Sequence, residues 1–321
     1  PDEYIIHEGT MTGCPAKVPD YRVSATRVEI WPGDKLIAYN AKFWLKNTVI
    51  FSMAKYQKSL RDDVVEFPAV GYSSRDGAYI IQHLEYPLGD KIAVYTDLGY
   101  YSKTGYRPVY GLINREKDYT LGVADGYFKD ADDRWIKKEP EFRLDLFRRP
   151  LGGLPVNYAF SALYGKWSDS AKSSWHQDYN LYLAADPVKL SDTLALKLGT
   201  GFRHVRESYD GSRNNIFRYD ASLEKKWSPR LTTLAGYHYI TDNRTLFDYN
   251  RDELGRQFDL GFMYKIDRMN SIGYLQTYDV ANNRIYDQDV TWYRNLHCWE
   301  AKITYRIKRS ELRVRLAIAR F

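Results

Sequence analysis

Cysteine, long apolar runs and clustered histidines are all scarce in this chain of 321 residues. Two cysteines are too few for a disulfide scaffold and do not suit a zinc site. No segment approaches the roughly 18–20 consecutive apolar residues of a transmembrane helix. The six histidines form no H-x-x-H or H-x-x-x-H pair, and no P-loop or other nucleotide motif is present. We therefore expect neither a metal site nor a cofactor.

Aromatic residues, by contrast, are abundant. They make up 16% of the sequence, with 29 tyrosines and 8 tryptophans, while the mean hydropathy is -0.56. Aromatic rings gather at the interfaces of a bilayer. A closed β-barrel pairs its backbone groups by closure, so it can span a membrane although its sequence is polar on average. The composition favours a transmembrane β-barrel over a soluble β-rich protein.

The last residues of the chain show the alternation of strands. Apolar residues occupy most odd positions from 301 to 307 and the even positions from 312 to 318, on either side of a turn at 308–310. This pattern predicts a hairpin with one apolar and one charged face. The chain stops on an aromatic residue, Phe321, which is typical of an outer-membrane barrel. Phe321 is in phase with the charged face, so we expect a bulge near Arg320 or a frayed end.

Similar segments, separated by turn residues, recur from Pro68 onward. Their lengths suit the ~9–11 residues of a tilted membrane-spanning strand. The predicted strands are Ala69–Ser73, Ala78–Tyr86, Lys91–Tyr101, Tyr106–Asn114, Asp118–Phe128, Arg134–Phe147, Val156–Trp167, Trp175–Ala185, Leu194–Arg206, Ile216–Trp227, Leu231–Thr241, Gln257–Ile266, Ser271–Tyr278, Arg284–Tyr293, Cys298–Ile307 and Glu311–Phe321. We predict an all-β fold, with an antiparallel transmembrane barrel of about sixteen strands (14–16) over residues 68–321.

Residues 1–56 follow a different pattern. Three short strands, Tyr21–Trp31, Lys35–Leu45 and Val49–Ala54, carry charged residues and lack a full spanning stretch. We interpret residues 1–56 as the end of a small periplasmic β domain and residues 57–67 as the linker to the barrel. The alternative is that they supply two further barrel strands.

The connections fall into two sets. One set is short, as in Tyr86–Asp90 and Trp227–Arg230, whereas the other is longer on average and includes Asp242–Arg256. Outer-membrane barrels have short periplasmic turns and longer external loops. An even strand count then places both chain ends in the periplasm and makes Asp242–Arg256 a solvated external loop.

Four segments together resemble the lipopolysaccharide-assembly outer-membrane protein family, LptD (organic solvent tolerance protein). They are TGCPAKVPDYRVSATRVEI at Thr12–Ile30, AYNAKFWLKNTVIF at Ala38–Phe51, the long stretch Val70–Ile113, and HCWEAKITY at His297–Tyr305. The family's barrel has around two dozen strands, follows a complete jelly roll and usually comes with four cysteines. The resemblance therefore implies a short or divergent member, in which residues 1–56 are the end of the jelly roll.

The resemblance implies a non-enzymatic translocon that inserts lipopolysaccharide into the outer leaflet of the bacterial outer membrane. The implied partners are lipopolysaccharide, outer-membrane lipids, periplasmic lipopolysaccharide-bridge proteins and a plug lipoprotein. In such a translocon the lipid leaves through a lateral gate between the first and last strands. Proline cannot donate to a strand ladder and glycine has no side chain to pack, so this seam should pair weakly. The gate residues would be Pro68, Val70, Gly71, Tyr72, Leu316 and Ile318. The plainer reading is that Pro68 simply begins the first strand.

Basic residues on the predicted inner face would contact the phosphates and sugars of a transported lipid, because guanidinium groups bind phosphate with two hydrogen bonds. These residues are Lys197, Arg203, Lys302, Arg306, Arg313 and Arg315. The alternative is that any wide barrel keeps its lumen polar. The net charge of +6 does not indicate nucleic-acid binding, since no continuous basic groove is expected on a membrane barrel.

The two cysteines are predicted to form a disulfide. Cys14 lies in the periplasmic segment, and Cys298 opens the penultimate strand, which starts at a periplasmic turn. The periplasm is oxidising, so thiols within reach should pair there. The alternative is two unpaired buried thiols.

Two other functions remain open. A diffusion porin would carry an inward-folded loop lined with acids and bases, and only Asp242–Arg256 is long enough. A barrel lipid hydrolase would need a serine and a histidine brought together with an orienting group. Ser173, Ser174 and His176 are close in sequence, but residues two or three apart on one strand do not meet reliably.

Overall fold

The computed structural model describes the chain apart from residues 1, 2, 13, 15, 16, 33, 34, 60–67, 90, 243, 297 and 319–321. Most of the expected linker 57–67, together with His297, Arg320 and Phe321, therefore lies outside the described residues. The described residues contain no helix that is long and apolar enough to cross a membrane. The strands form two separate sheets.

The first sheet is antiparallel and has the order β1-β2-β3-β4. Its strands are β1 (Tyr4–Met11), β2 (Tyr21–Trp31), β3 (Lys35–Leu45) and β4 (Thr48–Ser59). Alternate apolar side chains of β2 and β3 meet on one face, where Val23, Ala38 and Phe43 are almost fully buried. The Tyr56 ring packs edge-on against Phe43, with centroids 5.2 Å apart. This sheet has its own core and is not part of the barrel, so the alternative of two further barrel strands is wrong.

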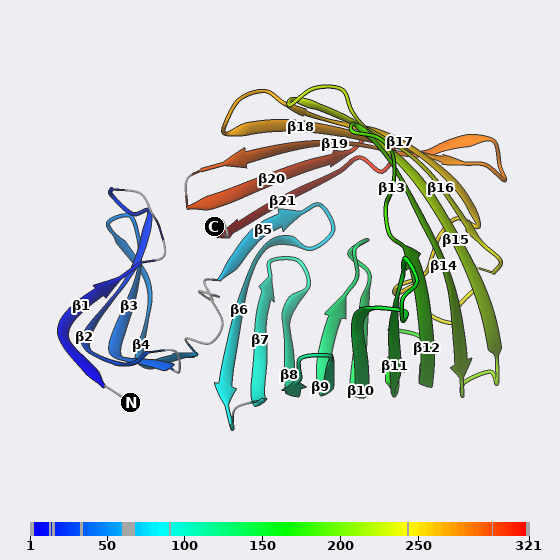
Figure 1. Ribbon diagram of the computed structural model, residues 1–321. Coiled ribbons are helices and arrows are strands. Elements are labelled where there is room, and N and C mark those ends of the chain that lie inside the picture. Colours follow the sequence, from blue (N-terminus) through cyan, green and yellow to red (C-terminus); the bar gives the residue numbers. More distant parts are fainter. Residues whose placement is uncertain are drawn as a thin grey trace.

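The second sheet closes on itself as an antiparallel barrel (Figure 1). Its strands are β5 (Ala69–Ser73), β6 (Gly77–Pro87), β7 (Ile92–Tyr101), β8 (Gly105–Arg115), β9 (Tyr119–Lys129), β10 (Trp135–Pro150), β11 (Val156–Ser168), β12 (Ser173–Ala185), β13 (Val188–Ser191), β14 (Leu194–Glu207), β15 (Arg213–Lys226), β16 (Leu231–Ile240), β17 (Arg256–Lys265), β18 (Asn270–Asp279), β19 (Arg284–Asn295), β20 (Trp299–Arg306) and β21 (Glu311–Ile318). The four-residue β13 pairs with the start of β14, and β12 pairs directly with β14 beside it. The wall therefore has sixteen strands, and the predicted fold class is confirmed.

The outer face of the wall is apolar. Register partners stand side by side on the same face of a sheet. Phe142 is opposite Tyr164, and Phe202 is opposite both Leu181 and Phe217. All five side chains are among the exposed large apolar residues. The alternation predicted from the sequence thus places apolar side chains outside and charged ones inside.

The two ends of the barrel differ. We call the end that holds the β19–β20 turn (residues 296–298) and the start of β5 the disulfide end. Cys14 and Cys298 are joined there, with Cα atoms 5.2 Å apart, so the predicted disulfide is present in the structure. Tyr21 and Trp299 pack edge to face beside it, with ring centroids 6.0 Å apart. These contacts fix the first sheet beside β20, β21 and β5 (Figure 1).

The seam between the first and last barrel strands is short within the part of the chain that the structure describes. The register of β21 and β5 joins four residue pairs, including Leu316 with Val70 and Arg315 with Gly71. The register of β11 and β12 joins thirteen. A Cβ at Gly71 would overlap the carbonyl oxygen of Val314 and the Tyr79 hydroxyl, so only glycine fits there. The five residues of β5 limit the pairing between described residues at this seam.

Candidate functional site

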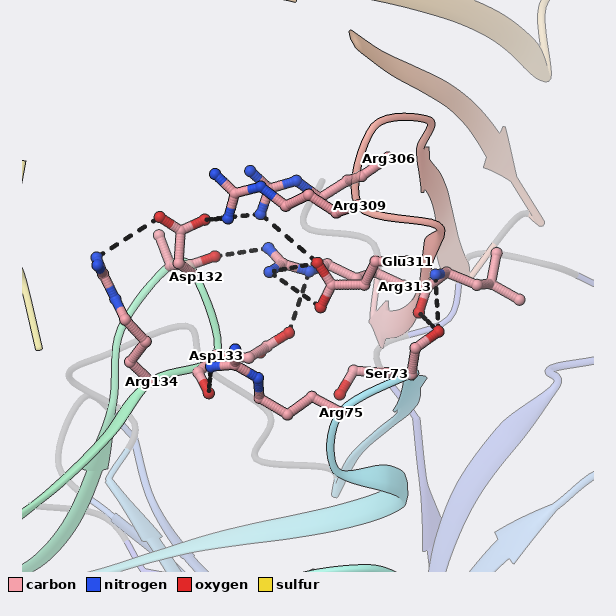
Figure 2. Close-up of polar contacts among 12 residues, drawn as sticks. Ser73, Arg75, Asp132, Asp133, Arg134, Arg306, Arg309, Glu311 and Arg313 are labelled. Carbon is pink, nitrogen blue, oxygen red and sulfur yellow. Dashed lines mark hydrogen bonds and ion pairs between the residues drawn. The ribbon is translucent and has the colours of Figure 1, made fainter. Parts of the chain in front are cut away.

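The turn between β9 and β10 folds over the end of the barrel opposite the disulfide. The Asp130 carboxylate shapes this turn, because it accepts hydrogen bonds from the backbone nitrogens of Asp132 and Arg134 at 2.8 and 2.9 Å. Asp133 has a φ of 60°, a left-handed conformation that aspartate tolerates better than most residues. This conformation lets Asp132 and Asp133 both point at the far wall (Figure 2).

Three arginines of the β20–β21 hairpin receive these two carboxylates. Asp132 Oδ1 accepts from Arg306 Nη1 at 2.6 Å and from Arg309 Nη1 at 3.3 Å. Asp133 Oδ2 lies 3.0 Å from Arg313 Nε. We call these five residues the mouth network. It joins hairpins from different parts of the wall, so it bridges the barrel mouth (Figure 2).

The arginines also have carboxylate partners on their own side of the mouth, in β19 and β21. Asp287 Oδ2 accepts from Arg306 Nη2 at 2.7 Å and lies 2.8 Å from Arg309 Nε. Glu311 Oε2 lies 3.3 Å from Arg313 Nη2. The Arg306 side chain is only 10% exposed. A buried guanidinium needs such compensation, because an unpaired buried charge is costly.

The long loop 241–255 also contacts both sides of the mouth. Glu253 accepts from Arg134 and from Arg309, each at 3.1 Å, and so links the β9–β10 turn to the β20–β21 hairpin. Phe247 is 1% exposed and packs with Ile136 and Trp167. The loop is therefore only partly solvated, because Phe247 is buried against the barrel while residues such as Arg244 and Asp248 are exposed.

Two side chains of this mouth have shifted pKa values. Burial alone would raise the pKa of Asp132, but the hydrogen bond and charge of Arg306, with Arg309 and Arg134, hold that pKa below its usual 3.8. Burial, and then the charge of Glu141, raises the pKa of Tyr249 in the long loop to about 12. Asp132 is thus charged at neutral pH, and Tyr249 is neutral.

Below the mouth network lies a cavity of about 560 Å³ in the lumen. Of the six predicted lumen cations, Lys302, Arg306, Arg313 and Arg315 line it. The other two are outside it and are paired. Lys197 Nζ donates to Glu224 at 2.7 Å, and Arg203 Nη2 lies 2.7 Å from Asp178.

The residues considered for a hydrolase are engaged in other contacts. Ser174 Oγ donates to the carbonyl of Trp175 and accepts from the backbone nitrogens of Ser208 and Tyr209. His176 Nδ1 lies 2.6 Å from Glu207 Oε1, and its ring stacks on Trp167. These contacts bind the wall together and do not form a nucleophile with its base.

A closed antiparallel wall with an apolar outer face and a charged interior defines a bacterial outer-membrane β-barrel. No protein-family model and no curated protein matches the chain. The solved structures similar to it include a triple-mutant porin of Rhodopseudomonas blastica, with 10% identity over 78% of this chain and 96% of that one and a TM-score of 0.40. OccK11 (OpdR) of Pseudomonas aeruginosa has 10% identity over 78% and 92%, with a TM-score of 0.41. A bacterial polysaccharide outer membrane secretin has 12% identity over 81% and 100%, with a TM-score of 0.43.

The expected membership of the lipopolysaccharide-assembly family is wrong. That family has a 26-strand barrel, whereas this wall closes with sixteen strands. The inferred translocon function, the lipopolysaccharide cargo and the bridge and plug partners are withdrawn with it. Of the four similar segments, Val70–Ile113 and His297–Tyr305 cover barrel strands, whose alternating aromatic residues are common to outer-membrane barrels. The other two lie in the separate first sheet.

Sequence reasoning missed the β9–β10 turn, Arg309 and Glu253. The signal was present as four acidic or basic residues in the five-residue turn 130–134, opposite the charged turn of the last hairpin. Nothing local in the sequence pairs these two turns. Their meeting depends on how the barrel closes.

Proposed function

We propose that this protein is a non-enzymatic channel for passive diffusion of small solutes across the outer membrane. The observation that carries the proposal is the mouth network together with the inward-folded loop 241–255. They place carboxylates of one side of the mouth against guanidinium groups of the other. Facing acids and bases make a strong local field in a water-filled passage, so they would screen solutes by size and charge.

The proposed orientation places the mouth network outside the cell and the first sheet in the periplasm. The long loop 241–255 belongs to the network end, and external loops of outer-membrane barrels are the longer ones. The disulfide then lies in an oxidising compartment, which suits its formation. In this assignment residues 1–56 are the periplasmic segment, 57–67 the linker and 68–321 the barrel.

Electrical recording from the purified full chain in a planar lipid bilayer tests the proposal. We expect discrete conductance steps, and liposomes carrying the protein should swell in small sugars but not in large ones. Folding is checked by the heat-dependent electrophoretic mobility of a closed barrel. A folded, inserted protein that passes neither ions nor sugars would overturn the channel function.

A further inference from the structure

Two basic side chains in the lumen cavity differ from the other lumen cations. Lys302 and Arg315 are register partners on β20 and β21, so they stand side by side on the inner face. Among the described residues, no carboxylate lies within ion-pair distance of either one. The cavity's three other basic residues, Lys129, Arg306 and Arg313, each have carboxylate partners.

Tyrosine rings flank this pair on both sides. The register runs from Tyr293 to Lys302, then to Arg315, Gly71 and Tyr79. Lys302 Nζ lies 5.6 Å from the centroid of the Tyr293 ring. On the other side, the Tyr79 hydroxyl lies over Gly71, where a Cβ would overlap it. The absence of a side chain at Gly71 brings Tyr79 next to Arg315.

Hydroxyl groups and position add to the site. Thr291 Oγ1 and Thr304 Oγ1 lie 3.0 Å apart and line the same cavity one register step toward the mouth. In that step Thr304 is the register partner of Arg313, which belongs to the mouth network. A solute that passes the network would therefore meet the Lys302–Arg315 pair next.

We propose that Lys302, Arg315, Tyr79 and Tyr293 form a binding site for an anionic sugar in the lumen. This inference rests on the proposed channel function. The two cations would receive a carboxylate or other oxyanion, since a guanidinium and an ammonium supply charge-assisted hydrogen bonds. The tyrosine rings offer apolar faces with polar hydroxyl tips, which suit the face and the hydroxyls of a pyranose ring. The network neutralises its own arginines, so the free positive charge of the cavity is concentrated at this pair.

Block of the ion current by added solutes tests the site. The probes are glucuronate, inorganic phosphate and glucose, added to the wild-type full chain and to the variant Lys302→Gln/Arg315→Gln. The matched control is Lys189→Gln/Arg268→Gln, which removes two exposed charges outside the cavity. We expect glucuronate to block the wild type and the control better than phosphate or glucose does. Loss of the two charges should weaken that block by about tenfold or more, because the variant can no longer donate charge-assisted hydrogen bonds to the anion.

The outcomes separate the two proposals. A wild type without conductance refutes the channel itself. A conducting double variant with wild-type glucuronate block overturns the site, and phosphate block as strong as glucuronate block overturns the role of the sugar ring. If the double variant does not assemble, the single variants Lys302→Gln and Arg315→Gln, which break no ion pair between described residues, give the same comparison.

Discussion

Releasing the β9–β10 turn from the mouth should open the channel. The perturbation is Asp132→Ala combined with Asp133→Asn, since asparagine keeps the left-handed backbone that alanine would strain. The double variant loses the carboxylate contacts of the turn with Arg306, Arg309 and Arg313. The hydrogen bond from Arg313 Nη1 to the Ala131 carbonyl, at 2.6 Å, remains. The Asp132 side chain is hydrogen-bonded and 25% exposed, so the lower bound for charged hydrogen bonds applies to it. The Asp133 side chain is 9% exposed and forms an ion pair with Arg313 that lacks hydrogen-bond geometry, so its contribution is smaller. At about 1.5 kcal/mol for Asp132 and about 1 kcal/mol for Asp133, the closed turn loses about 2.5 kcal/mol, or roughly 60-fold in its equilibrium.

The barrel itself should remain folded in this variant. Arg306 keeps Asp287, Arg309 keeps Asp287 and Glu253, and Arg313 keeps Glu311. None of the three guanidinium groups is therefore left without a carboxylate.

Single-channel recording at about 0.1 M salt, where the Debye length is ~10 Å, measures the effect. We expect a larger conductance and a higher open probability in the double variant. The control is Asp210→Ala, which removes a carboxylate from the β14–β15 turn at the same end, where it binds the Ser212 backbone. The reasoning fails if the double variant conducts like the wild type or if the control opens equally.

Three further predictions follow from the structure. The pKa of Asp132 in the folded protein is depressed below 3.8, so its pairing with the arginines is fully present above pH 3.8 and is lost as the pH falls through the folded pKa. Conductance should therefore be constant from pH 7 to about pH 4 and rise at lower pH. A rise in conductance between pH 7 and pH 5 would contradict this prediction. Reducing the bond between Cys14 and Cys298 should change the mobility on non-reducing electrophoresis and lower the free energy of unfolding by up to about 5.6 kcal/mol in the loop-entropy model. Urea unfolding of the oxidised protein and of the Cys14→Ser/Cys298→Ser variant measures this loss. Free-thiol labelling of both cysteines in the oxidised protein would show that the bond is absent. A disulfide engineered between Val70 and Leu316, which are register partners, should crosslink the seam and leave conductance unchanged. If the crosslinked variant does not conduct but the same variant conducts after reduction, the seam must open for transport.

Strand positions could be predicted because alternation is a local property of the chain. The predicted strand Leu194–Arg206 begins where β14 begins and ends one residue before it, and Ala69–Ser73 matches β5. The disulfide was predictable as well, since an even strand count places the β19–β20 turn at the same end as the first sheet.

The mouth network could not be predicted in this way. Asp132 and Arg306 are 174 residues apart, and their turns meet only because the wall closes with this number of strands. For the same reason, the six basic positions predicted to face the lumen could not be separated into paired and unpaired ones. Short segments of similar chemistry also led to the wrong family, because strand and turn patterns recur in unrelated barrels.

The Cys14–Cys298 bond has a topological consequence. It turns the chain between the two cysteines into one covalent ring that contains β2 through β19. The last hairpin, β20 and β21, is a tail outside that ring, and it closes the wall by pairing with β19 on one side and β5 on the other. The disulfide holds the start of this hairpin beside the first sheet. This hairpin carries the three arginines of the mouth and the Lys302–Arg315 pair, so these residues reach their positions only when the barrel is closed.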